Sequence, residues 1–352
     1  MSDWMNDAMS EPTSVQTTPS VRPRVLVTKA LTAPVERALA EHFEVFNSPT
    51  SDPAGIGAAA IAFAPHAIVV RDDLPHSICA DVPSLLHVAR HGVGLDVIPM
   101  AECARHAVTV SNVPGGNAIS VAEWCVAQML ALFHRLPQIG ESMRAGGWDV
   151  TRRAFSGKAR ELGGTRVGLI GCGAIGRALA HMLHQGFQVE VCAFTRTPST
   201  LPAHVRAVSL AECLAQAEVV VPCVPLTELT RGLIDAAAIA AMRPGAFLVN
   251  ASRGEVIDEA ALLAALRSGH LGGAALDVVA DRQWSADTTL PALPNLVVTP
   301  HLAGHTENAA QRNGASVVRA LQAVLLRGEK PEHLIDHAVW ASMMARRQRQ
   351  PD

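Results

Sequence analysis

Three glycines, Gly171, Gly173 and Gly176, have the spacing and the surroundings of a phosphate-binding turn. The apolar residues among 166–170 before them are typical of a strand covered on both faces, and apolar residues recur at helical spacing after them. In this pattern the first glycine allows a tight turn, the second lets backbone N–H groups approach a pyrophosphate, and the third lets helix and strand pack closely. Because the helix N-terminus adds partial positive charge, the stretch predicts a dinucleotide site.

Other residues that could do chemistry follow the ends of expected strands. Arg253 comes shortly after one strand, and its guanidinium can donate a bidentate pair of hydrogen bonds to carboxylate and carbonyl oxygens. His301 follows an apolar strand at 296–299 and a proline, and an ordinary histidine pKa near 6.5 suits a proton shuttle at neutral pH. Ligands of open parallel sheets bind at the carboxyl ends of strands, so the loops at 90–94 and 111–117 are candidate substrate contacts.

The elements that must position these residues alternate between strands and helices, which predicts an α/β fold of two doubly wound parallel-sheet domains. No further strand follows the helix expected at 307–327, so we place this helix on the first domain. The first domain is then discontinuous and flavodoxin-like, with a Rossmann cofactor domain inserted in it. Strands of the inserted domain are expected near 166–170, 189–194, 219–224, 246–250, 273–277 and 296–299. The predicted bounds are a flexible tail at 1–22, a substrate-binding domain at 23–118 and 303–335, a dinucleotide-binding domain at 119–302 and a C-terminal tail at 336–352, whose basic stretch at 345–349 is expected to be solvated.

Two segments between the predicted domains differ in character. Residues 121–135 are apolar nearly all round, which predicts a helix buried between layers that could join the domains. Residues 136–165 are more polar and rich in glycine, so we expect them to form a wrap-around connection.

The composition is that of an ordinary globular protein, with 352 residues, 49% hydrophobic and 17% charged. A net charge of -3 offers no basic field for nucleic acid, and no apolar run reaches the ~18 residues of a membrane span. The first twenty residues lack the basic and apolar regions of a signal peptide. Seven cysteines without a C-x-x-C pair are expected to be reduced core residues in the cytoplasm, and no metal site is expected.

Over about residues 24–330 the chain resembles the D-isomer-specific 2-hydroxyacid dehydrogenases, the family of glyoxylate and hydroxypyruvate reductases and phosphoglycerate dehydrogenase. The motifs that carry this resemblance occur in the family's order. They are Gly92-Val93-Gly94-Leu95-Asp96, Ser120-Val121-Ala122-Glu123, Gly171-Cys172-Gly173-Ala174-Ile175-Gly176, Pro225-Leu226-Thr227, Asn250-Ala251-Ser252-Arg253-Gly254, Ala275-Leu276-Asp277-Val278 and Thr299-Pro300-His301.

The resemblance implies hydride transfer between a nicotinamide cofactor and a 2-oxo acid, which needs a cation for the carboxylate, a proton donor for the developing alkoxide and a dry site. Arg253 suits the cation, and His301 matches the family's acid and base. The backbone N–H groups of Val93 and Gly94 resemble the carboxylate-binding loop. The residues expected to bind the cofactor are Gly171, Gly173, Ala174, Ile175, Thr195, Arg196, Cys223, Pro225, Thr230, Ala251, Asp277 and Gly304.

One catalytic position departs from the family pattern. The family pairs its histidine with a glutamate five residues after the aspartate that Asp277 matches, and the residue there is Arg282. Three alternatives follow. Asp281 supplies the carboxylate after a small loop shift; or Arg282 points to solvent or substrate while His301 works alone, with the acid limb of the pH profile moved down; or the protein binds cofactor and catalyses poorly.

A second departure concerns the choice of cofactor. NAD-specific Rossmann units have an acid about 20 residues beyond the glycines, which holds the ribose 2′-hydroxyl. Here Thr195 takes the place of that acid and Arg196 follows it. Loss of a negative charge beside an added cation suits a 2′-phosphate, so we predict a preference for NADP, with NAD possible. Relaxed specificity, with Arg196 solvated, is the alternative.

The sequence therefore predicts a cytoplasmic NAD(P)-dependent 2-oxoacid reductase of the glyoxylate or hydroxypyruvate reductase kind. Its partner is a small 2-oxo or 2-hydroxy acid, not nucleic acid or a membrane. The resemblance suggests a homodimer, with the helix that begins near Val121 at the interface. Because the family's glutamate is missing, the alternative is a catalytically weak dinucleotide-binding regulatory or interaction protein on the same scaffold.

Overall fold

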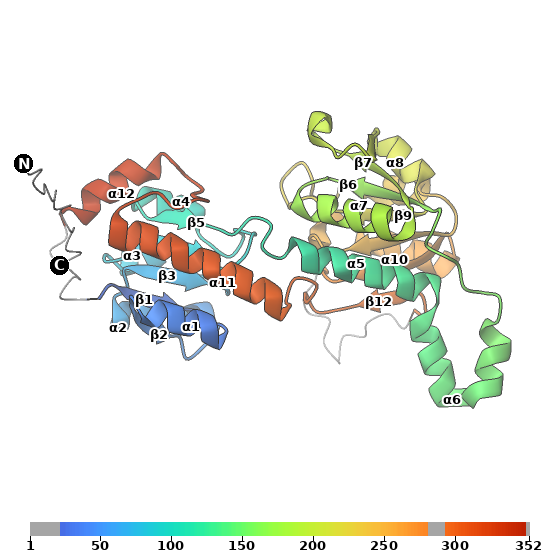
Figure 1. The fold of residues 1–352 in the computed structure, drawn as a ribbon, viewed down its shortest axis with the longest axis horizontal. Coiled ribbons are helices and arrows are strands. Elements are labelled where there is room, and N and C mark those ends of the chain that lie inside the picture. Colours follow the sequence, from blue (N-terminus) through green and yellow to red (C-terminus); the bar gives the residue numbers. More distant parts are fainter. Residues whose placement is uncertain (1–21, 281–292, 350–352) are drawn as a thin grey trace, which may run out of the picture.

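The computed structural model describes residues 22–280 and 293–349, which form two lobes that each contain one parallel sheet (Figure 1). The first-lobe sheet has the flavodoxin-like strand order β2-β1-β3-β4-β5, and the second-lobe sheet has the Rossmann order, β12-β11-β10-β9-β6-β7-β8. The predicted fold class is thereby confirmed. The first-lobe strands are β1 (Arg24–Val27), β2 (Glu44–Asn47), β3 (Ala67–Val70), β4 (His87–Arg90) and β5 (Thr109–Ser111). Those of the second lobe are β6 (Arg166–Ile170), β7 (Glu190–Phe194), β8 (Val205–Ala207), β9 (Val219–Pro222), β10 (Ala246–Asn250), β11 (Leu271–Leu276) and β12 (Leu296–Val298).

Helices cover both faces of each sheet. In the first lobe, the helices are α1 (Ala33–Ala40), α2 (Pro53–Phe63), α3 (Ile78–Asp81), α4 (Met100–Arg105), α11 (Glu307–Leu321), its π-helical continuation η3 (Gln322–Arg327), and α12 (Val339–Arg347). The remaining helices are α5 (Ala118–Phe133), α6 (Leu136–Phe155), α7 (Ala174–Phe187), η1 (Pro198–Thr200), α8 (Leu210–Gln216), α9 (Ala236–Ala241), η2 (Gly254–Val256) and α10 (Glu259–Ser268). Among the described helices, none is both long and apolar enough to cross a membrane.

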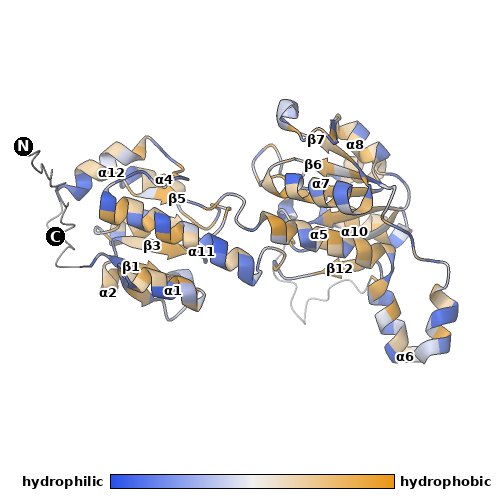
Figure 2. Cartoon of the chain, viewed as in Figure 1, coloured by the Kyte–Doolittle hydropathy of each residue, from blue (hydrophilic) through white to orange (hydrophobic). Residues whose placement is uncertain are grey.

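The strands are apolar because successive side chains enter cores on opposite faces (Figure 2). In β9, Val219 and Val221 pack with α5 and α7, whereas Val220 packs with α8, α9 and α10. In the first lobe, one core joins β1 and β3 to Val317 and Leu321 of α11. The late helix therefore returns to the first lobe, and that lobe is discontinuous as predicted. The exact residue bounds of the domains stay a prediction.

Two short edge strands were not expected from the sequence. In β2, none of the four residues is buried, and in β8 only Val205 is. Neither strand has the continuous apolar run that marks the central strands, because an edge strand has a neighbour on one side alone. The second-lobe sheet thus has seven strands, not the predicted six.

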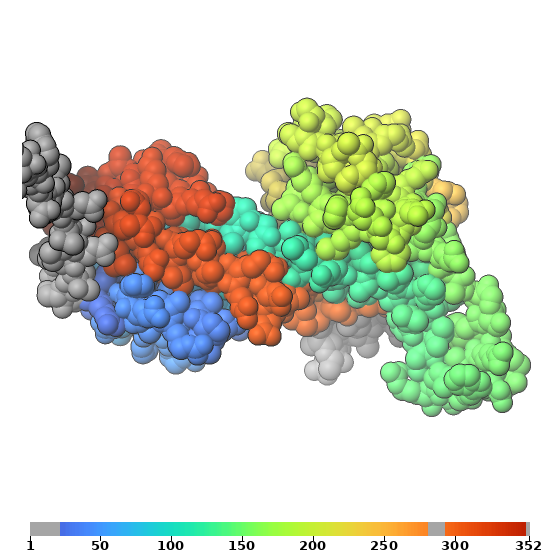
Figure 3. Space-filling view, in the orientation of Figure 1, coloured from blue at the N-terminus to red at the C-terminus, as the bar shows by residue number. Residues whose placement is uncertain are grey.

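The segment at 136–165 was expected to be a connection, and most of it is the helix α6. This helix stands out from the second lobe (Figure 3). It changes direction at Gly147, whose φ of 69° only glycine adopts without strain. The glycine content of this segment led to the prediction of an irregular connection. Gly146 and Gly147 interrupt the helix at the kink only.

Most of the C-terminal tail predicted at 336–352 is the helix α12, which packs on the first lobe. Met343 is fully buried and lies in the core formed by β1, β3 and α11. Arg346 donates hydrogen bonds to the carbonyl oxygens of His106 and Leu85, so the arginines of this segment hold the helix on the first lobe. The spacing of Val339 and Met343 by one helical turn is the signal that the basic composition obscured.

Candidate active site

The glycine turn between β6 and α7 has the geometry that the motif requires. Gly171 has a φ of 92°, and a Cβ there would lie 2.9 Å from the carbonyl oxygen of Cys223. A Cβ on Gly176 would lie 2.9 Å from the carbonyl oxygen of Gly171, so the start of α7 packs directly on the turn. At Gly173 a Cβ would meet nothing within 4 Å. The first and third glycines are therefore needed by the fold, and the second faces open space where a pyrophosphate fits.

The loop after β7 carries the two residues predicted to choose the cofactor. The Thr195 hydroxyl accepts a hydrogen bond from the backbone N–H of Thr197 at 3.3 Å. Arg196 is exposed, and within residues 22–280 and 293–349 its guanidinium has neither a hydrogen bond nor an ion pair. A cation is thus available next to the position where NAD-specific units have an acid.

The other residues predicted at the cofactor lie at the carboxyl ends of β9, the neighbour of β6, and of β10, the next strand in the sheet. The Cys223 N–H donates to Ile170 O at 2.7 Å, and burial raises the pKa of the Cys223 thiol to about 12, so it is neutral. The Thr230 hydroxyl donates to Pro225 O at 2.6 Å and closes their loop. Ala251 directly follows β10. Strand order explains why these separated segments meet at one edge.

Arg253 is positioned by a network around the buried Asn250. The Asn250 side-chain oxygen accepts from the Ser252 N–H at 2.9 Å and from the Ser252 hydroxyl at 2.7 Å, while its amide donates to Arg253 O at 3.0 Å. The Arg253 guanidinium donates from NH1 to Ser252 O at 2.8 Å and from NH2 to Asp96 Oδ1 at 3.0 Å. No role was predicted for Asn250 or Asp96, although both lie in motifs that carry the family resemblance.

The loop at 92–94 of the first lobe meets this arginine. A Cβ on Gly94 would lie 2.2 Å from Arg253 Nη2, so a side chain there would displace the guanidinium from the loop backbone. On the other side, Arg90 Nε donates to Gly94 O at 2.9 Å, and Asn112 donates to Val93 O at 2.8 Å. The structure thus brings together Arg253 and the two loop residues that were predicted to share a carboxylate.

The ion pair with Arg253 favours the charged form of Asp96. Burial opposes ionisation of Asp96, but the Arg253 guanidinium outweighs it and lowers the pKa of Asp96 below its ordinary value. The carboxylate is therefore charged at neutral pH, and it lies where Arg253 can meet an anion.

His301 lies in a strained turn that Asp277 holds in place. His301 has a φ of 56°, and its N–H donates to Asp277 O at 2.7 Å. The buried Asp277 carboxylate accepts hydrogen bonds from the Thr299 hydroxyl and from the N–H groups of Leu302 and Ala303, both at 2.8 Å. Left-handed backbone in a residue with a side chain is rare and concentrates at functional sites. Asp277 thus fixes the turn that carries His301, and its contact with a nicotinamide stays a prediction.

Two connections between the lobes lie side by side next to this turn. A Cβ on Gly304 would lie 2.5 Å from Asn117 Nδ2, and the hydroxyls of Ser120 and Thr306 are 2.7 Å apart. Gly304, predicted at the cofactor, therefore lies where the two connections approach each other closely. Asp281 and Arg282, on which the catalytic alternatives depend, lie outside the described residues.

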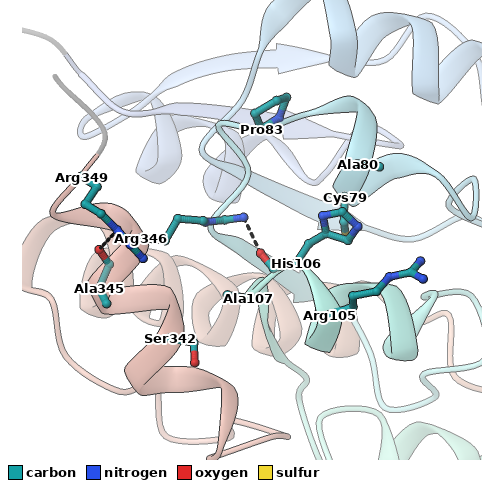
Figure 4. A pocket seen from close by; sticks show the side chains of 10 residues that line it. All are labelled: Cys79, Ala80, Pro83, Arg105, His106, Ala107, Ser342, Ala345, Arg346 and Arg349. Carbon is teal, nitrogen blue, oxygen red and sulfur yellow. Dashed lines mark hydrogen bonds between the residues drawn. The ribbon is translucent and has the colours of Figure 1, made fainter.

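A cavity of about 630 Å³ lies elsewhere, in the first lobe between α3, the end of α4 and α12. Figure 4 shows Arg346 reaching across it from α12 to the backbone of His106. None of the predicted site residues lines this cavity. It is therefore separate from the glycine turn, Arg253 and His301.

Comparison with known proteins shows the family of this chain. Residues 126–303 match the model of the D-isomer specific 2-hydroxyacid dehydrogenase NAD-binding domain. An (S)-sulfolactate dehydrogenase of Chromohalobacter salexigens is 37% identical over 257 residues, which cover 70% of this chain and 80% of the relative. The chain belongs to the D-isomer-specific 2-hydroxyacid dehydrogenase family. It is an NAD(P)-dependent oxidoreductase that transfers a hydride between the cofactor and a small 2-oxo or 2-hydroxy acid.

Two further members of the family are informative. The D-3-phosphoglycerate dehydrogenase of Mycobacterium tuberculosis is 37% identical over 253 residues, 70% of this chain but 46% of that protein. This chain thus spans less than half of that relative. The NADPH-dependent glyoxylate/hydroxypyruvate reductase of Sinorhizobium meliloti, solved with NADP and malonate, superposes with a TM-score of 0.77 at 30% identity and covers 89% of this chain and 97% of that one.

Proposed function

We propose that the chain is an NADPH-preferring 2-oxoacid reductase of the glyoxylate and hydroxypyruvate reductase kind. The observation that carries the proposal is the Arg253 guanidinium, which lies against the Gly94 backbone and pairs with Asp96 across the two lobes. Arg253 already binds one carboxylate there. A substrate carboxylate has the same chemistry. It can accept hydrogen bonds from the Arg253 guanidinium, either in place of Asp96 or together with it.

The chain's own residues then account for reduction of a carbonyl. When bound, the nicotinamide cofactor supplies the hydride. Arg253 and the N–H groups of Val93 and Gly94 hold the substrate carboxylate, and Arg253 draws electron density toward the carbonyl oxygen. The imidazole of His301 gives its proton to that oxygen as negative charge develops. The Asp277 carboxylate keeps the turn of His301 fixed through its three hydrogen bonds.

Oxidation of NADPH with glyoxylate, hydroxypyruvate and longer 2-oxo acids tests this proposal. We expect turnover with wild type, and an Arg253→Gln variant is expected to lose on the order of 100-fold or more in kcat/KM, because two charge-assisted hydrogen bonds disappear. Arg267→Gln, an exposed arginine at the end of α10, is the matched control. NADPH binding without turnover of any 2-oxo acid would instead support the regulatory alternative.

Cofactor preference makes a separate prediction. We expect kcat/KM to be at least about tenfold higher with NADPH than with NADH, because the Arg196 guanidinium pairs with the 2′-phosphate. Thr195→Asp restores the acid and is expected to move the preference toward NADH. Equal efficiencies with both cofactors in the wild type would contradict the proposal.

For the catalytic carboxylate, we propose that Asp281 supplies the partner of His301. Asp281→Asn is expected to lower kcat and to shift its pH dependence, since a neutral amide no longer favours the imidazolium. Unchanged turnover would leave His301 working alone, with Arg282 turned to solvent or substrate.

We also propose a cytoplasmic homodimer, with the substrate-binding domain at 23–118 and 303–335 and the dinucleotide-binding domain at 119–302. The support for self-association is α6, which exposes the apolar side chains of Leu136, Met143, Trp148 and Val150. The support for a reducing compartment is that all seven cysteines are free thiols. Light scattering is expected to give twice the chain mass of 37.1 kDa, and a monomer mass would refute the dimer.

A further inference from the structure

Two cysteine thiols of the first lobe are in contact, away from the candidate active site. Cys79 lies on α3 and Cys103 on α4, and their Sγ atoms are 3.6 Å apart. A disulfide bond is about 2.05 Å long, so the two sulfur atoms are about 1.5 Å from bonding distance. A small movement of either helix is therefore enough to bring them together.

The order of the strands places the two cysteines side by side. The helix α3 precedes β4 and the helix α4 precedes β5, and these two strands pair in parallel. Both helices pack on one apolar core, in which Cys79 and Cys103 are buried together with Val88 and Val110. The contact between the thiols is therefore set by the fold and not by the chance orientation of exposed side chains.

The two thiols differ in their access to small molecules. Cys79 lines the cavity of about 630 Å³ between α3, α4 and α12, and Cys103 does not. Figure 4 shows Cys79 and Arg346 among the side chains around this cavity. Because a water molecule takes up about 30 Å³ of the liquid, the cavity admits a small hydroperoxide. Such a reagent meets Cys79 first, with Cys103 behind it.

The two thiols also differ in how easily they ionise. When Cys79 is ionised, the Cys103 S–H donates to it, and this hydrogen bond lowers the pKa of Cys79 below its ordinary value. The Arg346 guanidinium adds to this effect, whereas burial and Glu102 oppose it. The contact with Cys79, together with burial, raises the pKa of Cys103. The thiolate, which is the reactive form, is thus favoured on the sulfur that lines the cavity.

We propose that Cys79 and Cys103 form a redox site that a hydroperoxide converts into a disulfide. Cys79 is the sulfur that reacts with the oxidant, and Cys103 is the sulfur that closes the bond. A disulfide in a reducing compartment is usually transient, so a dithiol returns the pair to two thiols by exchange. This site does not depend on the proposed reductase function.

The reaction takes two steps. The Cys79 thiolate attacks one oxygen of the hydroperoxide, the O–O bond breaks, and the leaving oxygen takes up a proton as water or an alcohol. Cys79 is thereby oxidised by two electrons to a sulfenic acid, and the hydroperoxide is reduced. The Cys103 sulfur then attacks the Cys79 sulfur, the S–O bond breaks, and hydroxide leaves with the Cys103 proton as water.

Mass spectrometry of the oxidised full chain tests the proposal. The reduced protein is treated with hydrogen peroxide while folded, then denatured and alkylated. Trypsin cuts after Arg90, so Cys79 and Cys103 lie on different peptides. We expect these two peptides to be joined with the loss of two hydrogen atoms, and dithiothreitol to restore both thiols. Complete alkylation of both cysteines after peroxide treatment, or a bond from either one to another cysteine, would overturn the proposal.

Variants assign the role of each sulfur. Cys103→Ala is expected to stop at the sulfenic acid, which dimedone traps on Cys79 as a stable adduct. Cys79→Ala is expected to give no adduct on Cys103, because that thiol does not line the cavity. An adduct on Cys103 in the second variant would refute the assigned roles.

The second lobe offers a matched control. Cys213 is buried and forms a hydrogen bond with the Cys192 thiol, and neither of them lines the cavity. Cys213→Ala therefore removes a buried thiol with a thiol neighbour, and it is expected to leave the Cys79–Cys103 disulfide unchanged. Loss of that disulfide in the control variant would show that its formation depends on a thiol outside the site and would refute the pair. The experiment on the wild type needs no variant to fold.

Discussion

At the scale of single residues, the three glycines of the turn have separable roles. Gly171 and Gly176 contact the backbone of the fold, whereas Gly173 faces open space. The sequence motif predicted all three roles, because their spacing is tied to one local geometry. The approach of Gly94 to Arg253 joins residues far apart in the chain, so it was predicted from the family resemblance and not from local spacing.

The glycine roles predict opposite results from two alanine substitutions. Gly173→Ala is expected to keep the melting temperature within about 2 °C of wild type and to weaken NADPH binding at least tenfold, because the methyl group occupies only the open space of the cradle. Gly171→Ala is expected to lower stability by more than about 1 kcal/mol, because of its φ of 92° and the contact with Cys223. Thermal melts and NADPH fluorescence titrations measure both. Unchanged NADPH affinity in Gly173→Ala would place the pyrophosphate elsewhere.

At the scale of elements, sequence patterns predicted the central strands and missed pieces whose order depends on tertiary contacts. The strand β6 and the helix α7 could be predicted from the sequence because burial of both faces of the strand requires a continuous apolar run. The edge strands β2 and β8 have weaker patterns because each pairs with one strand only, and the helix α12 has a weaker pattern because its order depends on contacts with several elements of the first lobe.

The packing of α12 predicts that a residue near the C-terminus stabilises the first lobe. Met343→Ala is expected to lower the free energy of unfolding by about 2–5 kcal/mol, since the side chain is fully buried in the core with α11. Ser342→Ala, one residue earlier and exposed, is expected to change it by less than about 0.5 kcal/mol. Urea unfolding compares the two. Similar small effects in both would mean that α12 is not part of the cooperative core.

At the scale of the whole molecule, buried histidines link stability to pH. His87 is fully buried between the hydroxyls of Thr109 and Ser111, at 2.8 and 2.9 Å, and burial lowers its pKa to about 3. Burial, with Arg71 adding to it, lowers the pKa of His91 to about 4. The unfolded chain, with histidine pKa values near 6.5, therefore binds more protons than the folded chain below that pH.

The stability that comes from keeping these two histidines neutral is fully present above pH 6.5. It is lost as the pH falls from 6.5 toward 3, because the unfolded chain takes up protons in that range. For His87 alone the loss is about 2 kcal/mol at pH 5. We expect His87→Gln, whatever its stability at pH 7, to give a shallower fall of unfolding free energy between pH 6.5 and 4, with the share of His91 retained. Urea unfolding at a series of pH values measures this, and parallel curves for variant and wild type would contradict it.

The return of α11 to the first lobe has a consequence for the order of folding during synthesis. The core around β1 and β3 needs Val317 and Leu321, which leave the ribosome about 200 residues after β5. The second lobe, built from one continuous stretch, has all its strands before then. The nascent chain therefore completes its later lobe first. Until α11 and α12 are synthesised, the apolar strands of the first lobe stay exposed. A chaperone has most apolar surface to protect during this interval.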